Sequence, residues 1–524
     1  MKLQKKHTTS LTKMKAVFLL SMTLFFSFSA LGAVGTGSLE SRFNVRTFGA
    51  KGDGKTLDSP AINKAIDAAA KAGGGTVFVP AGTYLSGSIH MQSNINLFID
   101  AGATILGAPQ EMNAYDETES YTFGGYQDGG HSYFHNSLIW GENLTNVFIT
   151  GNGMINGGGL TKDSGILDKM CGNDHWEKPD STVMPPVRLG NKAISLKLCK
   201  NVLIRDVTIF HGGHFAILAT GCDNMTVDNV TMDTNRDGID IDCCSNTTVS
   251  NCRINSPNDD GLCIKSTYAL GVVRLTENLT IVNCQVSGYK EGTLIDGTMK
   301  KGRDATGRIK FGTEASGGFR NVTITNCTFR YSRGIALEEV DGGILENITI
   351  SNISMVDVIN YAIYITTGKR NRTPGLTTVS RMKNVLISDI VASGISNWSG
   401  IIITGLPECP IEDLRLENIR LVFNGGGTKE QADKIPDELG TDYPELRKPV
   451  SAYGIFARHV KNLELANITT KFVKDDLRPA AMFYDIQGLE IDNFKPQVAE
   501  GVKAAVFGAD VSGVIIRNSP ALGK

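Results

Sequence analysis

A short phrase led by asparagine recurs along the chain and constrains its fold more than any other feature. Its copies include "NVLIRDVTI" from Asn201, "NMTVDNVTM" from Asn224 and "NTTVSNCRI" from Asn246, which are steps of 23 and 22 residues. Apolar and polar residues alternate in each copy, and Val, Ile and Thr are frequent, which is typical of short strands bounded by turns. Further copies begin at Asn278, Asn321, Asn347, Asn384 and Asn462. The sequence therefore predicts a tandem array of strand-and-turn units.

Such units predict a solenoid. A unit of about 22 residues cannot bury its own apolar face, whereas stacked units share one continuous core and pair all strand edges except those at the ends. We predict an all-β fold, a right-handed parallel β-helix over residues 111–524, with a cap and the first coils in residues 40–110. Repeated asparagines at the corners predict an amide ladder. Wider gaps between some copies indicate inserted loops, which often gather on the binding face.

A short helix is predicted to cap the N-terminal end of the solenoid. The stretch "LDSPAINKAIDAAAKAGGG" offers Ser59 as N-cap, Pro60 in the first turn and Gly73 as the stop. Its apolar face is formed by Ile62, Ala65, Ile66 and Ala69.

The first residues have the pattern of a signal peptide. Five lysines precede an apolar run from Ala16 to about Phe28, and small residues follow. The run is shorter than the ~20 residues of a membrane span. We expect residues 1–32 to be a signal peptide and the mature protein to be periplasmic or extracellular, without a membrane segment. An N-terminal membrane anchor is the alternative.

Charge and cysteine placement restrict the partners and the covalent structure. The chain has 52 basic and 54 acidic residues, so it lacks the basic field that a nucleic-acid partner requires. We expect a monomer. Five of the 10 cysteines recur after 21, 20, 21 and 43 residues and are predicted to stack in the core as mostly free thiols. These five are Cys222, Cys243, Cys263, Cys284 and Cys327; Cys171 and Cys199 fall outside this spacing.

Three aspartates are the candidate catalytic residues. Asp259 and Asp260 follow Asp237 by 22 and 23 residues, and stacked coils lie about 4.8 Å apart, so one coil step brings the three carboxylates together. Repulsion within such a cluster raises at least one pKa and places an acid beside a base, as glycosidic bond cleavage requires. The alternative is that "NRDG" and "NDDG" are only turns.

Several cations and a histidine are candidate substrate ligands. Lys265, Arg308 and Lys310 could meet an anionic group of a substrate, or be solvated surface charges. His214 lies about one coil before Asp237 and could contact a sugar or make a structural hydrogen bond. A second acidic group is predicted to be a turn or loop-side charge; it comprises Glu338, Glu339 and Asp341.

The motifs indicate neither a zinc site nor a nucleotide site, so no metal and no cofactor are expected. Because three clustered carboxylates can also bind calcium, a metal-dependent lyase stays open as an alternative.

With these aspartate blocks the chain resembles family-28 glycoside hydrolases, the polygalacturonase family of pectin-cleaving β-helices. The family's Asn-Thr-Asp block corresponds to "NRD" at residues 235–237, and its Asp-Asp block to residues 259–260. The opening "FGAKGDGKTLDSPAINKAIDAAAKAGGGTVFVPAGTY" is similar to the one this family shares with its pectin-active relatives. The resemblance covers roughly residues 43–480.

The resemblance implies inverting hydrolysis of α-linked galacturonic acid in a pectic polysaccharide or oligosaccharide, without a cofactor. Asp259 would be the general acid, while Asp237 and Asp260 would activate water. Asn235, within the matched block, is expected among the substrate-binding residues with His214, Lys265 and Arg308. An inverting pair is generally ~6.5–9.5 Å apart, which is wider than one coil step.

Two blocks of the family are missing here. Its Gly-His-Gly histidine corresponds to about Gly307, beside Arg308, and its Arg-Ile-Lys block to residues 336–338. With the inserted "DGTMKKGRDATGRIK", these changes resemble the exo-acting and rhamnogalacturonan-directed members. The alternatives are a rhamnogalacturonan galacturonohydrolase, a non-catalytic polysaccharide-binding β-helix and a pectate lyase.

Overall fold

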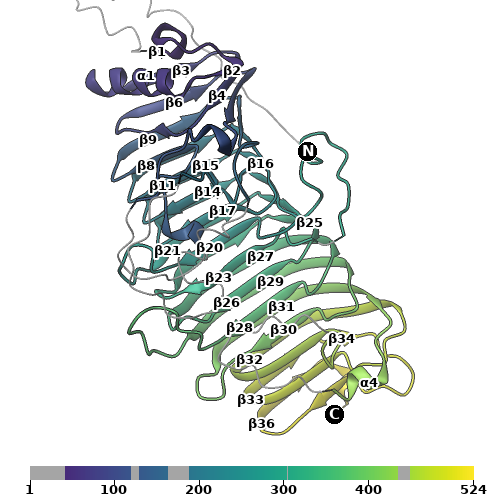
Figure 1. Ribbon diagram of the computed structural model, residues 1–524. Helices are drawn as coiled ribbons and strands as arrows, with labels where there is room; N and C mark the ends of the chain where they lie inside the picture. The colour runs from purple at the N-terminus through teal and green to yellow at the C-terminus, as the bar shows by residue number, and fades with distance from the viewer. Residues whose placement is uncertain (1–41, 120–128, 163–187, 304, 435–448, 524) are drawn as a thin grey trace, which may run out of the picture. The chain divides into compact units, whose positions relative to one another are not determined.

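Parallel strands stacked in coils make up most of the chain in a computed structural model (Figure 1). The structure describes residues 42–119, 129–162, 188–303, 305–434 and 449–523. The predicted signal peptide lies outside them and stays a prediction. Residues 41–524 form one compact unit, in which the cap and first coils continue into the later coils. The predicted all-β parallel solenoid is confirmed.

The strands form three parallel ladders. The first runs through β5 (Ile89–His90), β8 (Ile139–Glu142), β11 (Lys192–Lys197), β14 (Phe215–Thr220), β17 (Asp237–Asp242), β20 (Leu262–Ser266), β23 (Ile309–Ala315), β26 (Ile335–Glu339), β28 (Ile363–Thr367), β30 (Ile401–Thr404), β32 (Ile455–Lys474), β33 (Ala481–Asp492) and β35 (Ala505–Phe507). The second runs through β1 (Arg42–Asn44), β3 (Gly75–Val79), β6 (Ile95–Ile99), β9 (Thr145–Thr150), β12 (Lys200–Arg205), β15 (Asp223–Asp228), β18 (Ser245–Ser250), β21 (Thr276–Val282), β24 (Phe319–Thr325), β27 (Ile344–Val358), β29 (Arg381–Ile395), β31 (Ile411–Gly425), β32, β33 and β36 (Val511–Arg517).

The third ladder consists of short strands and merges into the second. Its members are β2 (Asp53–Leu57), β4 (Gly82–Ser86), β7 (Ala103–Gly107), β10 (Met154–Asn156), β13 (Thr208–Phe210), β16 (Thr231–Asp233), β19 (Arg253–Asn255), β22 (Gln285–Ser287) and β25 (Thr328–Ser332). From β27 onward one long strand pairs with members of both ladders.

Period-two alternation places the core inside the coils and the polar residues outside. In β17, Ile239 and Ile241 are fully buried, and Ile239 lies in register with Ile217 of β14 and Leu262 of β20. Because successive side chains of a strand point to opposite faces, Asp240 and Asp242 point outward from the same strand. The outer face of the first ladder thus presents polar side chains next to one another from coil to coil.

The cap helix is α1 (Ser59–Lys71), and its predicted apolar face is buried as expected. The N-cap prediction was wrong by one residue. Asp58 is the N-cap, and its carboxylate accepts hydrogen bonds from the backbone N–H groups of Lys51 and Gly52 at 2.7 and 2.9 Å. The hydroxyl of Ser59 instead accepts from the N–H of Gly87 in a neighbouring coil.

The predicted asparagine ladder is present. Asn224 Nδ2 donates to Asn201 Oδ1 at 3.3 Å, and Asn321 Nδ2 donates to Asn278 Oδ1 at 3.0 Å. These residues adopt positive φ, near 55°, a left-handed conformation that Asn tolerates better than most residues. The ladder therefore supplies both a corner conformation and a hydrogen bond between coils.

The cysteines are free thiols, as predicted for most of them, but their arrangement differs. The described cysteines form no disulfide, and Cys171 lies outside the described residues. The single predicted stack was wrong, because the recurrent spacing spans different corners of the coils. One stack contains Cys199, Cys222 and Cys244, and a second contains Cys252, Cys284 and Cys327.

Within the described part of the chain, no helix is long and apolar enough to cross a membrane.

Candidate active site

Two neighbouring coils carry the three aspartates. Asp237 opens β17, and Asp259 and Asp260 stand just before β20, so the N–H of Gly238 donates to the Asp260 carbonyl at 3.1 Å. One oxygen from each carboxylate lies within 4.8 Å of the others. The glycine after Asp237 permits this approach, because a Cβ at Gly238 would lie 2.3 Å from a carbonyl oxygen of the next coil. The structure thus brings together the three residues that spacing had grouped.

Asp260 is buried and held by two cations. Arg308 Nε donates to its Oδ1 at 2.5 Å, and Lys310 Nζ lies 2.7 Å from its Oδ2. Burial alone would raise the pKa of Asp260, but the charges of Arg308 and Lys310 outweigh it and hold the pKa well below its usual range. Asp260 therefore favours its ionised form.

Asp237 has the opposite environment. Its Oδ1 accepts a hydrogen bond from the backbone N–H of Asp260 at 3.1 Å, and it forms no ion pair with any described residue. Burial first, and then the negative charges of Asp259 and Asp240, raise its pKa well above the usual value. Asp237 therefore favours its protonated form, so the cluster holds a neutral acid close to the ionised Asp260.

Asp259 is the most accessible of the three carboxylates. Its side chain is 29% exposed, compared with 1% for Asp260. Arg236 Nη2 donates to its Oδ2 at 2.8 Å, and the N–H of Asp260 donates to its Oδ1 at 3.0 Å. Its backbone is fixed by the N–H of Gly307, which donates to its carbonyl at 3.0 Å. Among the three, Asp259 is placed best to touch a ligand.

Three further residues line this part of the coil. His214 is buried, and its Nδ1 lies 3.1 Å from both the Lys162 carbonyl oxygen and Arg236 Nη1. Asn235 is partly exposed, and its carbonyl accepts from the N–H of Asn258. Sequence reasoning missed Arg236, although its signal was present: it stands where the family's block has threonine.

Lys265 lies on the outer face of β20 but is nearly buried there. Its Nζ lies 3.4 Å from Asp240, 3.2 Å from Glu314 and 2.9 Å from His131 Nε2. Burial alone would lower the pKa of Lys265, but Asp240 and Glu314 outweigh it and raise the pKa well above its usual value. Lys265 thus faces protein carboxylates in this structure, as Arg308 and Lys310 do, and its contact with a substrate remains a prediction.

The second acidic group is not made of loop-side charges, so that prediction was wrong. Glu338 and Glu339 belong to β26, and with Asp341 they are buried. Asp341 pairs with Arg370 at 2.5 Å, and Glu338 lies 3.6 Å from Arg308. The turn-like sequence "EEVDGG" concealed this burial, because the partner arginines are distant along the chain.

The carboxylate cluster has the donor types that calcium prefers. Arg308 and Lys310 already balance Asp260, and their charges would repel a divalent cation at the same place. The absence of a metal cofactor stays a prediction.

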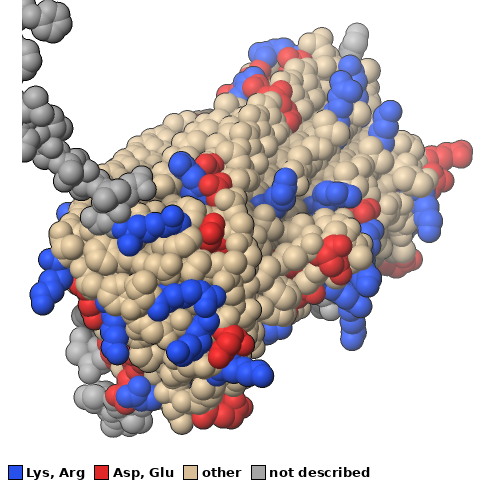
Figure 2. Space-filling view, turned by 90° about the horizontal axis from the view of Figure 1, so that it is seen from above, with Lys and Arg blue, Asp and Glu red and all other residues tan. Residues whose placement is uncertain are grey.

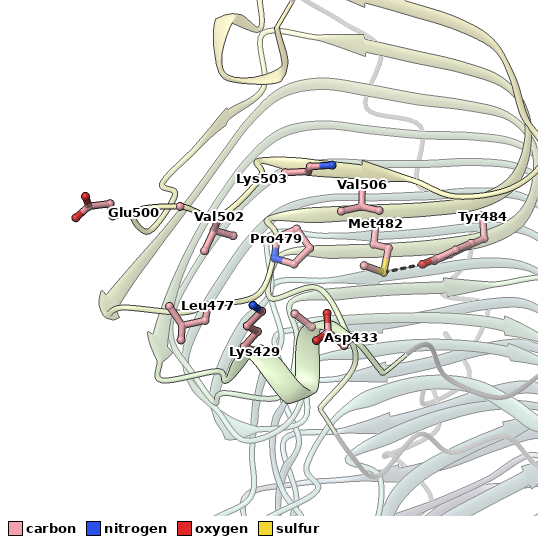
Figure 3. A pocket seen from close by; sticks show the side chains of 12 residues that line it. Lys429, Asp433, Leu477, Pro479, Met482, Tyr484, Glu500, Val502, Lys503 and Val506 are labelled. Atoms are coloured by element: carbon pink, nitrogen blue, oxygen red, sulfur yellow. Dashed lines mark hydrogen bonds between the residues drawn. The ribbon is translucent and has the colours of Figure 1, made fainter.

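A cavity of about 560 Å³ lies away from this cluster (Figure 3). It is found far along the first ladder, where Met482, Tyr484 and Val506 form its floor and Lys429 and Lys503 lie at its edge. Lysines there are accompanied by Asp433 and Glu500, so the cavity has no excess of one charge. None of the three aspartates contributes to it.

Basic and acidic side chains are interspersed over the face shown in Figure 2. This mixture agrees with the formal net charge of -2.

Comparisons with known proteins identify the class of fold to which this chain is similar. The family described as "Rhamnogalacturonase A/epimerase, pectate lyase-like" matches residues 42–263. The crystal structure of a hyperthermoactive exopolygalacturonase from Thermotoga maritima is similar with a TM-score of 0.58 and 20% identity, over 82% of this chain and 91% of that one. The fold is accordingly the right-handed parallel β-helix of polygalacturonases, as predicted.

Two relatives found by sequence comparison also have names of the polygalacturonase type. A "Probable polygalacturonase" of Vitis vinifera is 27% identical over 288 residues, which are 52% of this chain and 52% of that protein. An "Exo-poly-alpha-D-galacturonosidase" of Dickeya chrysanthemi is 28% identical over 243 residues, 40% of this chain and 39% of that protein. The chain thus spans about half or less of the length of these two relatives.

Proposed function

We propose that the protein is a glycoside hydrolase that cleaves α-galacturonosyl linkages in pectic chains. The observation that carries the proposal is the triad of carboxylates, in which Asp260 is held ionised and Asp237 retains a proton. Such a separation of pKa values is what acid–base cleavage of a glycosidic bond requires. The names of the relatives point to the same substrate class.

In the proposed reaction, Asp259 donates a proton to the glycosidic oxygen while the bond between that oxygen and the anomeric carbon breaks. The oxygen keeps the electron pair of the broken bond. A water molecule attacks the anomeric carbon and gives its proton to Asp260, or to Asp237 once Asp237 has passed its own proton to Asp259. One water is added to the bond, and no other reactant is needed. Asn235, His214, Lys265 and Arg308 are the proposed substrate-binding residues. Lys265 and Arg308 would contact the substrate while each keeps its protein carboxylate partners.

We propose exo-action and inversion as the finer description. The chain between β22 and β23 supports attack near a chain end, because its last residues lie against Asp259: the N–H groups of Thr306 and Gly307 donate to the carbonyls of Pro257 and Asp259, each at 3.0 Å. The N–H groups of Leu294 and Ile295 donate to Asp233 at 2.9 and 3.1 Å, and Lys301 pairs with Asp357 at 2.8 Å. Inversion rests on the family resemblance, since the nearest carboxylate oxygens are closer than a typical inverting pair.

A rhamnogalacturonan-directed hydrolase is the second candidate, favoured by the description of the family that matches residues 42–263. We also propose export of the mature chain, on the signal-peptide pattern of residues 1–32, and a monomeric state.

The deciding experiment offers purified protein oligosaccharides of homogalacturonan and of rhamnogalacturonan and measures new reducing ends. Products one uronic acid shorter support exo-action on the backbone that reacts. Binding without any product from either backbone would instead indicate a non-catalytic polysaccharide-binding module.

A further inference from the structure

Side-chain exposure separates Arg236 from the other cations near the aspartates. Arg236 is 30% exposed, whereas Arg308 is 3%, Lys310 10% and Lys265 7% exposed. Of these four, only Arg236 offers substantial surface to an incoming ligand.

The three buried cations form ion pairs with protein carboxylates. Arg308 and Lys310 hold Asp260, and Lys265 lies between Asp240 and Glu314. Turning one of them toward a substrate would leave a buried carboxylate without its partner, which is strongly unfavourable.

The pair of Arg236 and Asp259 is different, because both of its side chains are about 30% exposed. Water can solvate the two groups when they separate, and ion pairs of this kind contribute little net stability. The pair can therefore open at small energetic cost, and it stands directly at the most accessible carboxylate of the cluster.

We propose that Arg236 is a receptor for the carboxylate of the substrate, which it binds in exchange for Asp259. The planar guanidinium presents two parallel N–H donors that match a carboxylate. The carboxylate of a uronate can therefore take the place of the Asp259 carboxylate. This inference rests on the proposed function and adds a specificity-determining residue to it.

The exchange also defines a complete cycle of proton transfers within the cluster. While Arg236 holds Asp259 in an ion pair, the proton of the cluster resides on Asp237, whose pKa is raised by burial and by neighbouring negative charges. When the substrate takes Arg236, Asp259 loses its cation, and a proton moves from Asp237 to Asp259 through a bridging water. Asp259 then protonates the glycosidic oxygen, and Asp237, now ionised, accepts the proton of the attacking water. The cycle ends in its starting protonation state.

A substrate without a free carboxylate leaves Arg236 on Asp259, so the proton stays on Asp237 and is not delivered to the glycosidic oxygen. The enzyme therefore discriminates against esterified uronides through turnover as well as through binding. This discrimination is the property that the experiment measures.

The test compares kcat/KM for an oligogalacturonide and for its methyl ester in wild type, Arg236→Gln and Arg236→Lys. Arg236→Gln should reduce the preference for the free acid at least tenfold, because the charge-assisted, two-pronged contact is lost and no cation remains to hold Asp259 with either substrate. Arg236→Lys should keep part of the preference, because Lys carries the charge without the fork.

Arg320→Gln is a matched control, since Arg320 pairs with Glu277 at 3.0 Å with 37% and 30% exposure on the second ladder. It should leave the preference unchanged, and melting temperatures should show that all variants are folded. An unchanged preference in a folded Arg236→Gln, or loss of activity on both substrates there, would overturn the inference while the proposed function stands. If Arg236→Gln does not fold, an unchanged preference in Arg236→Lys overturns it equally. A wild type that cleaves neither substrate would overturn the proposed function itself.

Discussion

The backbone N–H of Asp260 donates to Oδ1 of Asp237 over 3.1 Å and joins two coils at the carboxylate cluster. This hydrogen bond helps to explain how three carboxyl groups are held together: a backbone donor faces Asp237, and Arg308 and Lys310 face Asp260. The resulting difference in pKa between Asp237 and Asp260 is the basis of the mechanism proposed above.

Replacement of Asp259 by Asn should remove the proton donor while the turn is preserved. General acid catalysis typically contributes ~10²–10⁴-fold, so kcat should fall by about that factor with little change in KM. Asp223→Asn is the control, because Asp223 is also 29% exposed and paired with an arginine, Arg274 at 2.6 Å, but lies in β15 on the second ladder. Near-normal kcat in Asp259→Asn would show that the aspartates are only turn residues.

Replacement of Asp237 by Asn should abolish most activity and yet stabilise the fold at neutral pH. The pKa of Asp237 is raised in the native state relative to ~3.9 in the unfolded chain, so the native state binds more protons between these values. The contribution of Asp237 to the stability of the wild type therefore falls as pH rises above about 4, whereas Asn cannot ionise.

The measurement is the difference in melting temperature between Asp237→Asn and wild type from pH 4 to pH 8. This difference should increase with pH in favour of the variant. A difference that is constant with pH, or that favours wild type at pH 8, would contradict the raised pKa.

Replacement of Arg308 by Gln should destabilise the protein strongly, because Asp260 would keep only Lys310 as a charged partner in a buried place. Removal of one member of a buried ion pair commonly costs about 3–5 kcal/mol in unfolding free energy. Chemical denaturation should show this loss, whereas Arg320→Gln, in a half-exposed pair, should lose ~0–1 kcal/mol. Equal losses in the two variants would argue against the buried charge network.

The asparagine ladder predicts an unusual order of stabilities at Asn224. Asn224→Gly keeps the left-handed φ of 54° and loses only the amide contact, whereas Asn224→Ala also places a Cβ in that strained conformation. A left-handed non-glycine residue costs about 1–2 kcal/mol, so Ala should be less stable than Gly by roughly that amount in denaturant titrations. An Ala variant as stable as Gly would show that the corner relaxes.

The periodic features of the sequence predicted most of the fold. The repeat at Asn201, Asn224 and Asn246 sets both the coil step and the ladder, because stacking forces equivalent positions into register. The same step predicted that Asp237 would meet Asp259 and Asp260.

Features that depend on side chains from distant coils or inserted loops were not predicted. The burial of Lys265 depends on His131 and Glu314, and the burial of Asp341 depends on Arg370. None of these three partners has a fixed sequence spacing from the residue it contacts. The prediction of a single cysteine stack was wrong for a similar reason, since equal spacing does not distinguish one corner of a coil from another.

The most direct test of the central claim is to cleave an oligogalacturonide in oxygen-18-labelled water with a calcium chelator present. Hydrolysis at the three aspartates predicts that each cleavage places one labelled oxygen at the anomeric carbon of a new reducing end, as mass spectrometry would show. It also predicts that ultraviolet absorbance does not rise and that Asp259→Asn shows little product. An unlabelled product with a new ultraviolet-absorbing double bond would instead identify a β-eliminating lyase and contradict the account.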